Sequence, residues 1–420
     1  MGAGTAQRGA CLLISGKVRK NMEFVVFAGV LLLLFIFMIV QELIQTKNQE
    51  KLFKKYLREN YGKEPPKEYS LERFARLGSY LERHKEEKQL DDITWNDLGM
   101  DEVFRRIDRT YSAAGEEYLY YTLRNISCGR EALEHLEEVV NWLQEQENIK
   151  VRIQLLMKRL GHLGKYSLYD YLDNLDYLGE RSNRKIVLGN LLYLPFLLLL
   201  FVQPAMGTIG IVLCMLWHIM TYFREKKVIE PYIISFAYVL RLIDVCEELE
   251  KQKIPVYRRE LDELREVLKS LRELRRGAYW VMAGNQGKIG GNPLDILADY
   301  LRMILHLDIF QFNRMLEKLR KKTGQVETML AITGYLDMAI SVGGFRKSLE
   351  GYCIPKLEED TEKAFLHMKK GWHPLLSQPV KNSIRADRGI LLTGSNASGK
   401  STFLKMVAVN AVLAQTIHTC

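Results

Sequence analysis

Eight consecutive residues match the phosphate-binding loop pattern G-x-x-x-x-G-K-[ST]: Gly394, Ser395, Asn396, Ala397, Ser398, Gly399, Lys400 and Ser401. Gly394 and Gly399 allow the backbone to curl so that its N–H groups point at phosphate oxygens. Lys400 would bring a positive charge to the β- and γ-phosphates, and the Ser401 hydroxyl would ligate Mg²⁺. The pattern predicts binding of ATP with Mg²⁺, with Thr402 beside the loop, although it does not by itself distinguish ATP from GTP.

A loop of this kind needs a strand before it and a helix after it. Residues 390–393 are apolar and partly β-branched, which is typical of a buried parallel strand. Residues from Thr402 to about Ile417 carry apolar side chains at helical intervals. We therefore expect strand, loop and helix in that order, as in a P-loop domain.

Three apolar runs approach the length of about 20 residues that crosses a bilayer: residues 24–40, 186–202 and 209–223. Basic clusters flank all three runs and can share the cytoplasmic side: Lys47, Lys51, Lys54, Lys55, Arg58, Arg181, Arg184, Lys185, Arg224, Lys226 and Lys227. We expect three transmembrane helices, with a hairpin turn at 203–208. The protein would then be a multi-pass cell-membrane protein whose ATP site faces the cytoplasm.

The N-terminal tail, residues 1–23, opposes this topology because its basic residues would lie outside: Arg8, Lys17, Arg19 and Lys20. A translation start at Met22 removes the conflict, so we expect residues before Met22 to be wrongly assigned. Two alternatives stay open. Residues 24–40 can be a cleaved signal peptide, and residues 186–223 can be a buried helical hairpin of a soluble protein.

The net charge of +9 does not indicate nucleic-acid binding, because the eleven cations that flank the apolar runs exceed the whole surplus. The six cysteines have neither close pairing nor metal-ligand spacing: Cys11, Cys128, Cys214, Cys246, Cys353 and Cys420. We expect reduced thiols, as in a cytosol-facing protein, and no protein-bound zinc.

The remaining regions are mainly helical by pattern. We expect a cytosolic helical core domain at 41–185 and a helical lever or arm at 228–350, in which apolar residues recur three and four apart. A glycine-rich connection at 284–293 lacks the GK[ST] ending of a phosphate loop. The pattern changes at Phe365, so residues 365–420 should begin the nucleotide-binding domain.

Four segments, in this order, resemble the MutS family of ABC-type ATPases. They are residues 107–116 (IDRTYSAAGE), 334–339 (GYLDMA), 371–376 (GWHPLL) followed by 379–382, and the phosphate loop with its flanks. The likeness covers about residues 95–420. It implies a mainly α fold with an incomplete α/β P-loop domain of ABC/MutS type at the C-terminus, and a contact of Asn382 on the adenine side.

The resemblance implies an ATP-dependent DNA mismatch-repair protein that forms a homodimer in its complete form, with DNA as partner. The aromatic Phe-x-Glu wedge of mismatch readers has no match that could reach DNA. The acidic magnesium motif, signature segment and switch histidine are absent from these 420 residues. We therefore expect no complete catalytic set and ATP held without turnover. The alternatives are a membrane-associated ATPase that acts on membrane or protein partners, and a non-catalytic scaffold.

Overall fold

The computed structural model describes residues 37–38, 40–41, 44–64, 69, 71–86, 88–126, 129–163, 167–275, 293–358, 365–395 and 399–420. The chain divides into two compact units, Met1–Glu59 and Asn60–Cys420. In the first unit, residues 44–59 are helical, and the Lys54 ammonium lies 2.6 Å from the Glu50 carboxylate one turn away. The expected tail at 1–23 and most of the expected span at 24–40 lie outside the described residues, as does nearly all of the glycine-rich connection at 284–293.

The second unit begins with short helices that pack into a core. Their bounds are α2 (Leu71–Arg83), α3 (Asp92–Leu98), α4 (Met100–Ile107), α5 (Ala113–Arg124), α6 (Arg130–Glu145), α7 (Glu147–Leu160) and α8 (Leu168–Asp173), followed by the 3₁₀ turn η1 (Leu175–Leu178). Side-chain caps begin several of them. Asp91 accepts from Thr94 N, Ser112 accepts from Gly115 N, and Ser167 forms a capping box with Asp170. These caps satisfy amides that have no partner within their own helix.

Helix α16 (Thr323–Lys347) runs through this core and contacts α4, α5, α6, α7 and α12. It is long and apolar enough to cross a membrane, yet 83% of its most apolar window is buried by the protein itself. Leu336, Val342 and Phe345 are almost wholly inaccessible to solvent. An all-round apolar surface therefore belongs here to a helix enclosed by other helices.

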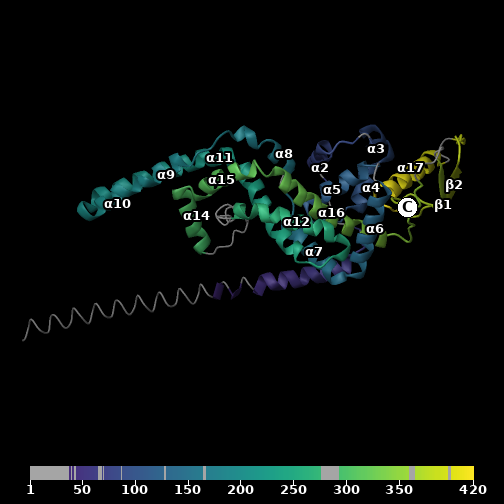
Figure 1. Cartoon of the computed structure of the whole chain (residues 1–420), viewed down its shortest axis with the longest axis horizontal. Helices are drawn as coiled ribbons and strands as arrows, with labels where there is room; N and C mark the ends of the chain where they lie inside the picture. Colours follow the sequence, from purple (N-terminus) through teal and green to yellow (C-terminus); the bar gives the residue numbers. More distant parts are fainter. Residues whose placement is uncertain are drawn as a thin grey trace, which may run out of the picture. The chain divides into compact units, whose positions relative to one another are not determined.

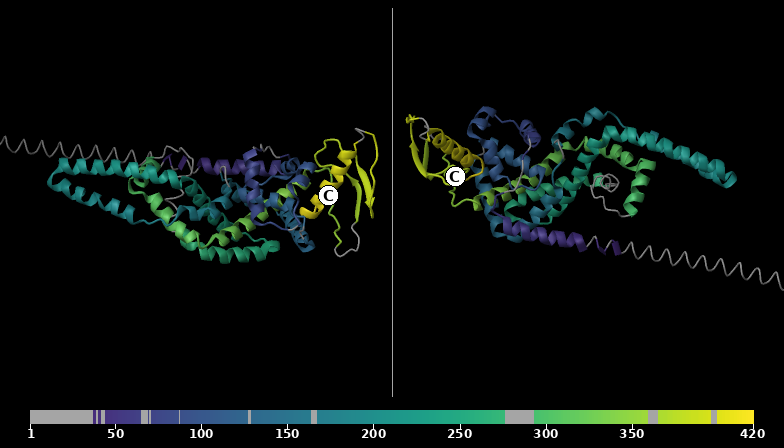
Figure 2. Two further views of the ribbon diagram at one scale, coloured as in Figure 1. Left: turned by 90° about the horizontal axis from the view of Figure 1, so that it is seen from above. Right: turned by 180° about the vertical axis from the view of Figure 1, so that it is seen from behind.

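The expected spans at 186–202 and 209–223 coincide with α9 (Arg184–Leu191), α10 (Tyr193–Val202) and the first part of α11 (Pro204–Glu250). Two helical segments, Arg184–Val202 and Pro204–Glu250, are long and apolar enough to cross a membrane. Helices α10 and α11 run alongside each other (Figures 1 and 2). Only 6% and 28% of their most apolar windows are buried. We call residues 184–223 the apolar hairpin.

Helix α11 does not end where the apolar hairpin ends. It continues as one helix of 47 residues into the core, where Phe236, Tyr238 and Leu242 are buried. At a rise of 1.5 Å per residue, such a helix is roughly 70 Å long. The expected boundary at 228 therefore falls inside a continuous helix that belongs to both the hairpin and the lever.

We keep the name lever for residues 228–350. After the end of α11 they contain the 3₁₀ turn η2 (Pro255–Tyr257), α12 (Arg258–Leu271), the 3₁₀ turn η3 (Arg272–Arg275), α14 (Pro293–Leu305), α15 (Leu307–Leu319) and α16. Helix α12 packs on both α11 and α16. Leu261, Leu264 and Leu271 form its buried face, whereas charged residues such as Arg258 lie exposed. This matches the expected amphipathic arm, whose charges are solvated.

The C-terminal region contains a two-stranded antiparallel sheet of β1 (Leu366–Gly371) and β2 (Asn382–Ala386), followed by α17 (Lys400–Thr416). The expected parallel strand at 390–393 does not form. Ile390 and Leu391 are 53% and 89% exposed, and no described residue pairs with them. A parallel strand needs neighbours that are joined by crossover connections, and β1 and β2 form only a separate antiparallel pair. The mainly helical fold is confirmed, while the α/β part of the expectation is not shown.

Candidate nucleotide-binding site

The described part of the phosphate loop leads directly into a helix. Gly399 has a φ of +84°, a left-handed conformation that side chains with a Cβ rarely adopt, and α17 begins at the next residue. Ser401 and Thr402 lie exposed in its first turn, while Asn396, Ala397 and Ser398 lie outside the described residues. The order of loop and helix that the pattern predicts is therefore present, although the preceding strand is not.

The side chain of Lys400 folds back over the loop. Its ammonium group donates to the carbonyl oxygen of Gly394 and, at 2.5 Å, to that of Ser395. The N-cap of α17 is a glycine, so no side chain from that position caps the first amides of the helix. The loop thus combines a cation with a helix N-terminus, and both features favour an anion.

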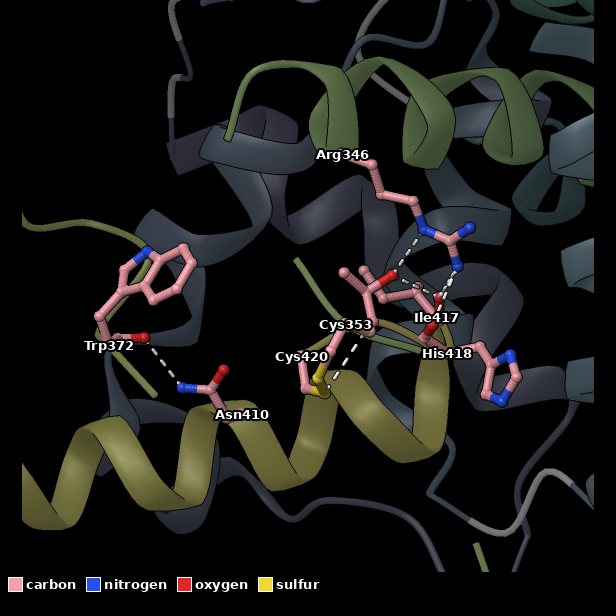
Figure 3. Close-up of a disulfide and its surroundings, with 8 residues drawn as sticks. Arg346, Cys353, Trp372, Asn410, Ile417, His418 and Cys420 are labelled. Atoms are coloured by element: carbon pink, nitrogen blue, oxygen red, sulfur yellow. Dashed lines mark hydrogen bonds between the residues drawn. A yellow bond between two sulfur atoms is a disulfide. The ribbon is translucent and has the colours of Figure 1, made fainter. Parts of the chain in front are cut away.

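One face of α17 fixes this helix on its neighbours. Met406, Val409 and Leu413 are buried, and the helix contacts α5, α3 and β1. The amide nitrogen of Asn410 donates to the carbonyl of Trp372 at 3.0 Å, just after β1 (Figure 3). The described loop residues Gly394, Ser395 and Gly399 are exposed, while the helix that follows them is anchored on its neighbours.

The other expected residues of this region lie in turns and in strand β2. The Asn382 amide donates to the carbonyl of Val380 at 3.0 Å, and Val380 is exposed. His373 accepts from the backbone amide of Leu375 at 3.3 Å, as a turn residue does, and burial, with a smaller contribution from Lys405, lowers its pKa. The contact of Asn382 on the adenine side stays a prediction.

The far end of α17 docks on a buried arginine of α16. The Arg346 guanidinium donates to Thr419 Oγ1 at 2.8 Å and to the carbonyls of Ile417 and His418 at 3.2 and 2.9 Å (Figure 3). It also lies 2.8 Å from the Glu137 carboxylate of α6. A positive charge at the C-terminus of a helix satisfies carbonyls that lack helical partners. This contact connects the loop helix to the lever and to the core.

A second buried joint connects two of the segments that resemble the MutS family. The Asp337 carboxylate on α16 accepts from the backbone amides of Tyr111 and Ser112 at 3.0 and 2.9 Å, and from the Ser112 hydroxyl at 2.6 Å. The helices approach closely because two glycines face each other's helix. A Cβ on Gly334 would lie 2.6 Å from the Ala114 carbonyl, and one on Gly115 would lie 2.4 Å from Asp337.

The sequence did not identify Arg346, Glu137 or Asp337 as residues that connect distant helices. The signal was present for Asp337, because an ionisable residue inside an apolar helical run needs a buried partner. The partners themselves are 226 and 225 residues away, at Tyr111 and Ser112. Only the folded arrangement reveals them.

Polar residues also connect the apolar hairpin to the lever. Asn190 donates to the Leu305 carbonyl at 3.0 Å, and the Tyr222 hydroxyl donates to the Asp308 carboxylate at 2.8 Å. His218 lies 2.8 Å from the carbonyl of Cys214 through Nδ1, and its ring contacts that of His306. We call the three pairs that cross to the lever, Asn190–Leu305, Tyr222–Asp308 and His218–His306, the hairpin joint.

The expectation of reduced thiols is wrong for two cysteines. Cys353 and Cys420 form a disulfide with a Cα–Cα distance of 5.1 Å (Figure 3). They are 67 residues apart, so no local spacing indicated the pair. Among the described cysteines, Cys214 and Cys246 are free and buried. No group of three or more His, Cys, Asp or Glu side chains among the described residues could hold a metal ion.

No family model matches the chain. Human MutS protein homolog 4 is 28% identical over 123 residues, which is 27% of this chain and 12% of that protein. The DNA mismatch repair protein MutS of Acholeplasma laidlawii is 33% identical over 110 residues, 25% of this chain and 13% of that protein. MutS of Leptospira interrogans is 31% identical over 124 residues, 27% of this chain and 14% of that protein.

The matched part of the chain thus spans about an eighth of the length of these three curated relatives. The identities, in proteins of both bacterial and animal origin, support a distant relationship of this chain to the MutS family.

Proposed function

We propose that this protein is a membrane-anchored, MutS-like protein that binds ATP with Mg²⁺ at residues 394–401. The observation that carries the proposal is the left-handed Gly399 placed directly before α17, with Lys400 and Ser401 in its first turn. This arrangement brings a cation, a hydroxyl and a helix N-terminus together where Gly399 and Ser401 are exposed. We assign nucleotide binding, and not turnover, to these residues.

Each residue of the loop has a distinct part in the proposed binding. A triphosphate would compete with the carbonyls of Gly394 and Ser395 for the Lys400 ammonium, which already lies at the loop. The exposed hydroxyl of Ser401 would supply one magnesium ligand, and phosphate oxygens and water would supply the others, as is usual for this ion. The first amides of α17 would donate to the phosphates.

Calorimetry on the full chain in lipid nanodiscs tests this binding. We expect heat on addition of Mg-ATP, and its loss in the Lys400→Ala variant, because removal of the ammonium leaves the phosphate charge uncompensated. Lys405→Ala is the matched control, since Lys405 is an exposed lysine of the same helix. A titration with Mg-GTP decides the base preference. Equal heats from the Lys400 variant and the parent chain would refute the assignment.

The apolar hairpin supports the membrane anchor. Its exposed large side chains include Leu198, Phe201, Val202, Leu213 and Met220. Transfer of each such side chain from water into an apolar phase is worth about 1.5–3 kcal/mol, so together they favour lipid strongly. We expect the protein to stay in the membrane pellet after carbonate washing. Release into the supernatant would contradict the anchor.

The names of the relatives suggest DNA mismatch repair as the wider role, with DNA as partner. Binding of the full chain to duplex DNA in nanodiscs of neutral lipid tests it. Affinity should fall steeply as salt rises, because phosphate contacts release counterions. Absence of binding, or affinity that salt does not change, would remove DNA from the proposal and leave nucleotide binding and anchoring intact.

One observation favours a second function, an ATPase that acts on the membrane or on protein partners. Helix α11 is continuous from the apolar hairpin into the core, and the hairpin joint adds hydrogen bonds to the lever at Leu305 and Asp308. A movement of the lever would therefore reach the hairpin. Site-directed spin labels at Leu198 and Leu213 should change their distance on addition of Mg-ATP under this function, and an unchanged distance would exclude it.

A further inference from the structure

The disulfide between Cys353 and Cys420 joins two segments with different roles. Cys353 lies in the extended segment that leaves α16, and Cys420 follows α17, the helix that begins at the phosphate loop. Two backbone hydrogen bonds hold the same pair, Cys353 N to Cys420 O at 2.6 Å and Cys420 N to Cys353 O at 3.0 Å. Figure 3 shows the sulfur–sulfur bond close to the last turn of α17 and to the Arg346 contacts.

We propose that Cys353 and Cys420 form a thiol–disulfide exchange site, which fastens the C-terminal end of α17 to the segment leaving α16. Its reactants are small-molecule disulfides and thiols of the glutathione class. The further consequence, that the oxidised pair restrains the phosphate loop and changes its affinity for nucleotide, rests on the proposed ATP binding. The exchange chemistry itself does not.

Accessibility makes the pair selective. Cys353 is exposed and Cys420 is partly exposed, so a small thiol or disulfide can approach the bond from the Cys353 side. Cys214 and Cys246 are buried, and burial raises the pKa of the Cys246 thiol well above its ordinary value. Because the thiolate is the reactive form, buried thiols of this kind exchange slowly. Among the described cysteines, the reactive positions are therefore 353 and 420.

The chemistry balances without a further reactant. The Cys353 thiolate attacks a small disulfide and releases one small thiolate, which leaves a mixed disulfide on Cys353. The Cys420 thiolate then attacks the Cys353 sulfur and releases the second small thiolate. The two protein thiols lose two electrons, the small disulfide gains them, and the two thiol protons pass to the released thiols. Excess small thiol runs both steps backwards.

Backbone hydrogen bonds join the two residues beside the disulfide, and in the proposed cycle they also hold the reduced thiols near each other. The paired amides and carbonyls of Cys353 and Cys420 hold their Cα atoms 5.1 Å apart, within the range that a disulfide spans without backbone movement. The Arg346 guanidinium also holds Ile417, His418 and Thr419, which precede Cys420. The reduced pair therefore stays docked through hydrogen bonds, and oxidation adds a covalent restraint to the same joint.

The redox state of the compartment would determine whether the two cysteines are crosslinked. In the proposed topology this region faces the cytoplasm, where thiols are kept reduced and disulfides are mostly transient or redox-sensing. The joint would be held by hydrogen bonds alone under those conditions. A rise in oxidised glutathione would add the crosslink and restrain α17.

The test equilibrates the full chain in nanodiscs with mixtures of reduced and oxidised glutathione, then alkylates free thiols and quantifies each cysteine by mass spectrometry. We expect positions 353 and 420 to lose their thiols together, while 214 and 246 stay free. Hydrogen exchange of the last turn of α17 should slow by about tenfold or more on oxidation, because a crosslink opposes local opening. Cys353→Ser should abolish the response, and Cys246→Ser should leave it unchanged.

Two results would overturn the exchange site: free thiols at 353 and 420 in the most oxidising buffer, or separate mixed disulfides with no crosslink. Calorimetry with Mg-ATP on both redox states then separates the two proposals. Different affinities in the two states support the regulatory link, and equal affinities overturn that link. Absence of nucleotide binding in both states refutes the proposed function, while the crosslink measured by mass spectrometry stands by itself.

Discussion

Two apolar stretches of this chain have opposite surroundings. The most apolar windows of Arg184–Val202 and α16 both meet the length and composition of a membrane span, but 6% of the first is buried and 83% of the second. The difference lies in their polar residues. Helix α16 carries Asp337 and Ser341, which are fully buried and bonded to residues before α5. A fully buried carboxylate with partners distant in sequence thus marks the core helix, whereas the hairpin exposes large apolar side chains such as Leu198 and Phe201 and bonds to the lever through Asn190.

The largest effect should come from placing a charge in each stretch. Leu336→Asp buries an unpaired carboxylate where the wild-type side chain is 0% exposed, and we expect a loss of more than about 4 kcal/mol, enough to prevent folding. Leu198→Asp changes a side chain that is 68% exposed, so the protein should still fold in detergent and should insert less well in lipid. Denaturation in detergent measures the stability of both variants. Equal losses would contradict the contrast.

The close approach of α16 to α5 can be tested with two glycines of the same helix. Gly334→Ala places a methyl group 2.6 Å from the backbone carbonyl of Ala114, which cannot move freely, so stability should fall by about 2–3 kcal/mol. Gly324→Ala is the control, because no atom lies within 4 Å of its new Cβ. That change should be neutral or stabilise by about 0.5–1 kcal/mol. A neutral Gly334 variant would mean that the helices do not pack so closely.

The hairpin joint should make stability depend on pH. Burial, and the neighbouring His218, lower the pKa of His306 to about 4, below the ordinary value of 6.5. The unfolded chain therefore binds the proton more tightly, and stability that is complete above pH 6.5 is lost as the pH falls towards 4. Lowering the pKa from 6.5 to about 4 corresponds to at most about 3 kcal/mol, and solvent screening reduces the loss that we expect to about 2 kcal/mol. In His306→Asn, which tolerates the left-handed backbone at this position, denaturation midpoints should lose that part of their pH dependence.

The smallest effect should come from a single hydrogen bond of the hairpin joint. Tyr222→Phe removes the hydroxyl that donates to Asp308 at 2.8 Å and leaves the ring in place. We expect a loss of about 1 kcal/mol, because the buried carboxylate keeps other partners, among them the backbone amide of Ile309. Tyr177→Phe is a matched control, since Tyr177 is 86% exposed. If the two variants have the same stability, the joint does not contribute.

Periodicity alone predicted much of the helical architecture, including the amphipathic α12 and the helix after the phosphate loop. It did not predict that residues 390–393 would lack strand structure, because a strand depends on partners that local pattern cannot supply. It also could not place α16 in the core. Hydropathy indicates that a helix avoids water, but not whether protein or lipid covers it. The Cys353–Cys420 disulfide was missed for the same reason, at a separation of 67 residues.

The sequence by itself determined the chemical groups of residues 394–401, because the backbone freedom of glycine, the charge of lysine and the hydroxyl of serine do not depend on the surroundings. It also determined which stretches are too apolar to remain in water. Tertiary structure alone decided which apolar helix is enclosed, which carbonyls accept hydrogen bonds from Arg346 and which amides donate to Asp337. The physical reason is distance along the chain. Propensity, charge and hydrophobicity act locally, whereas a buried charge needs a partner that only folding brings within about 3 Å.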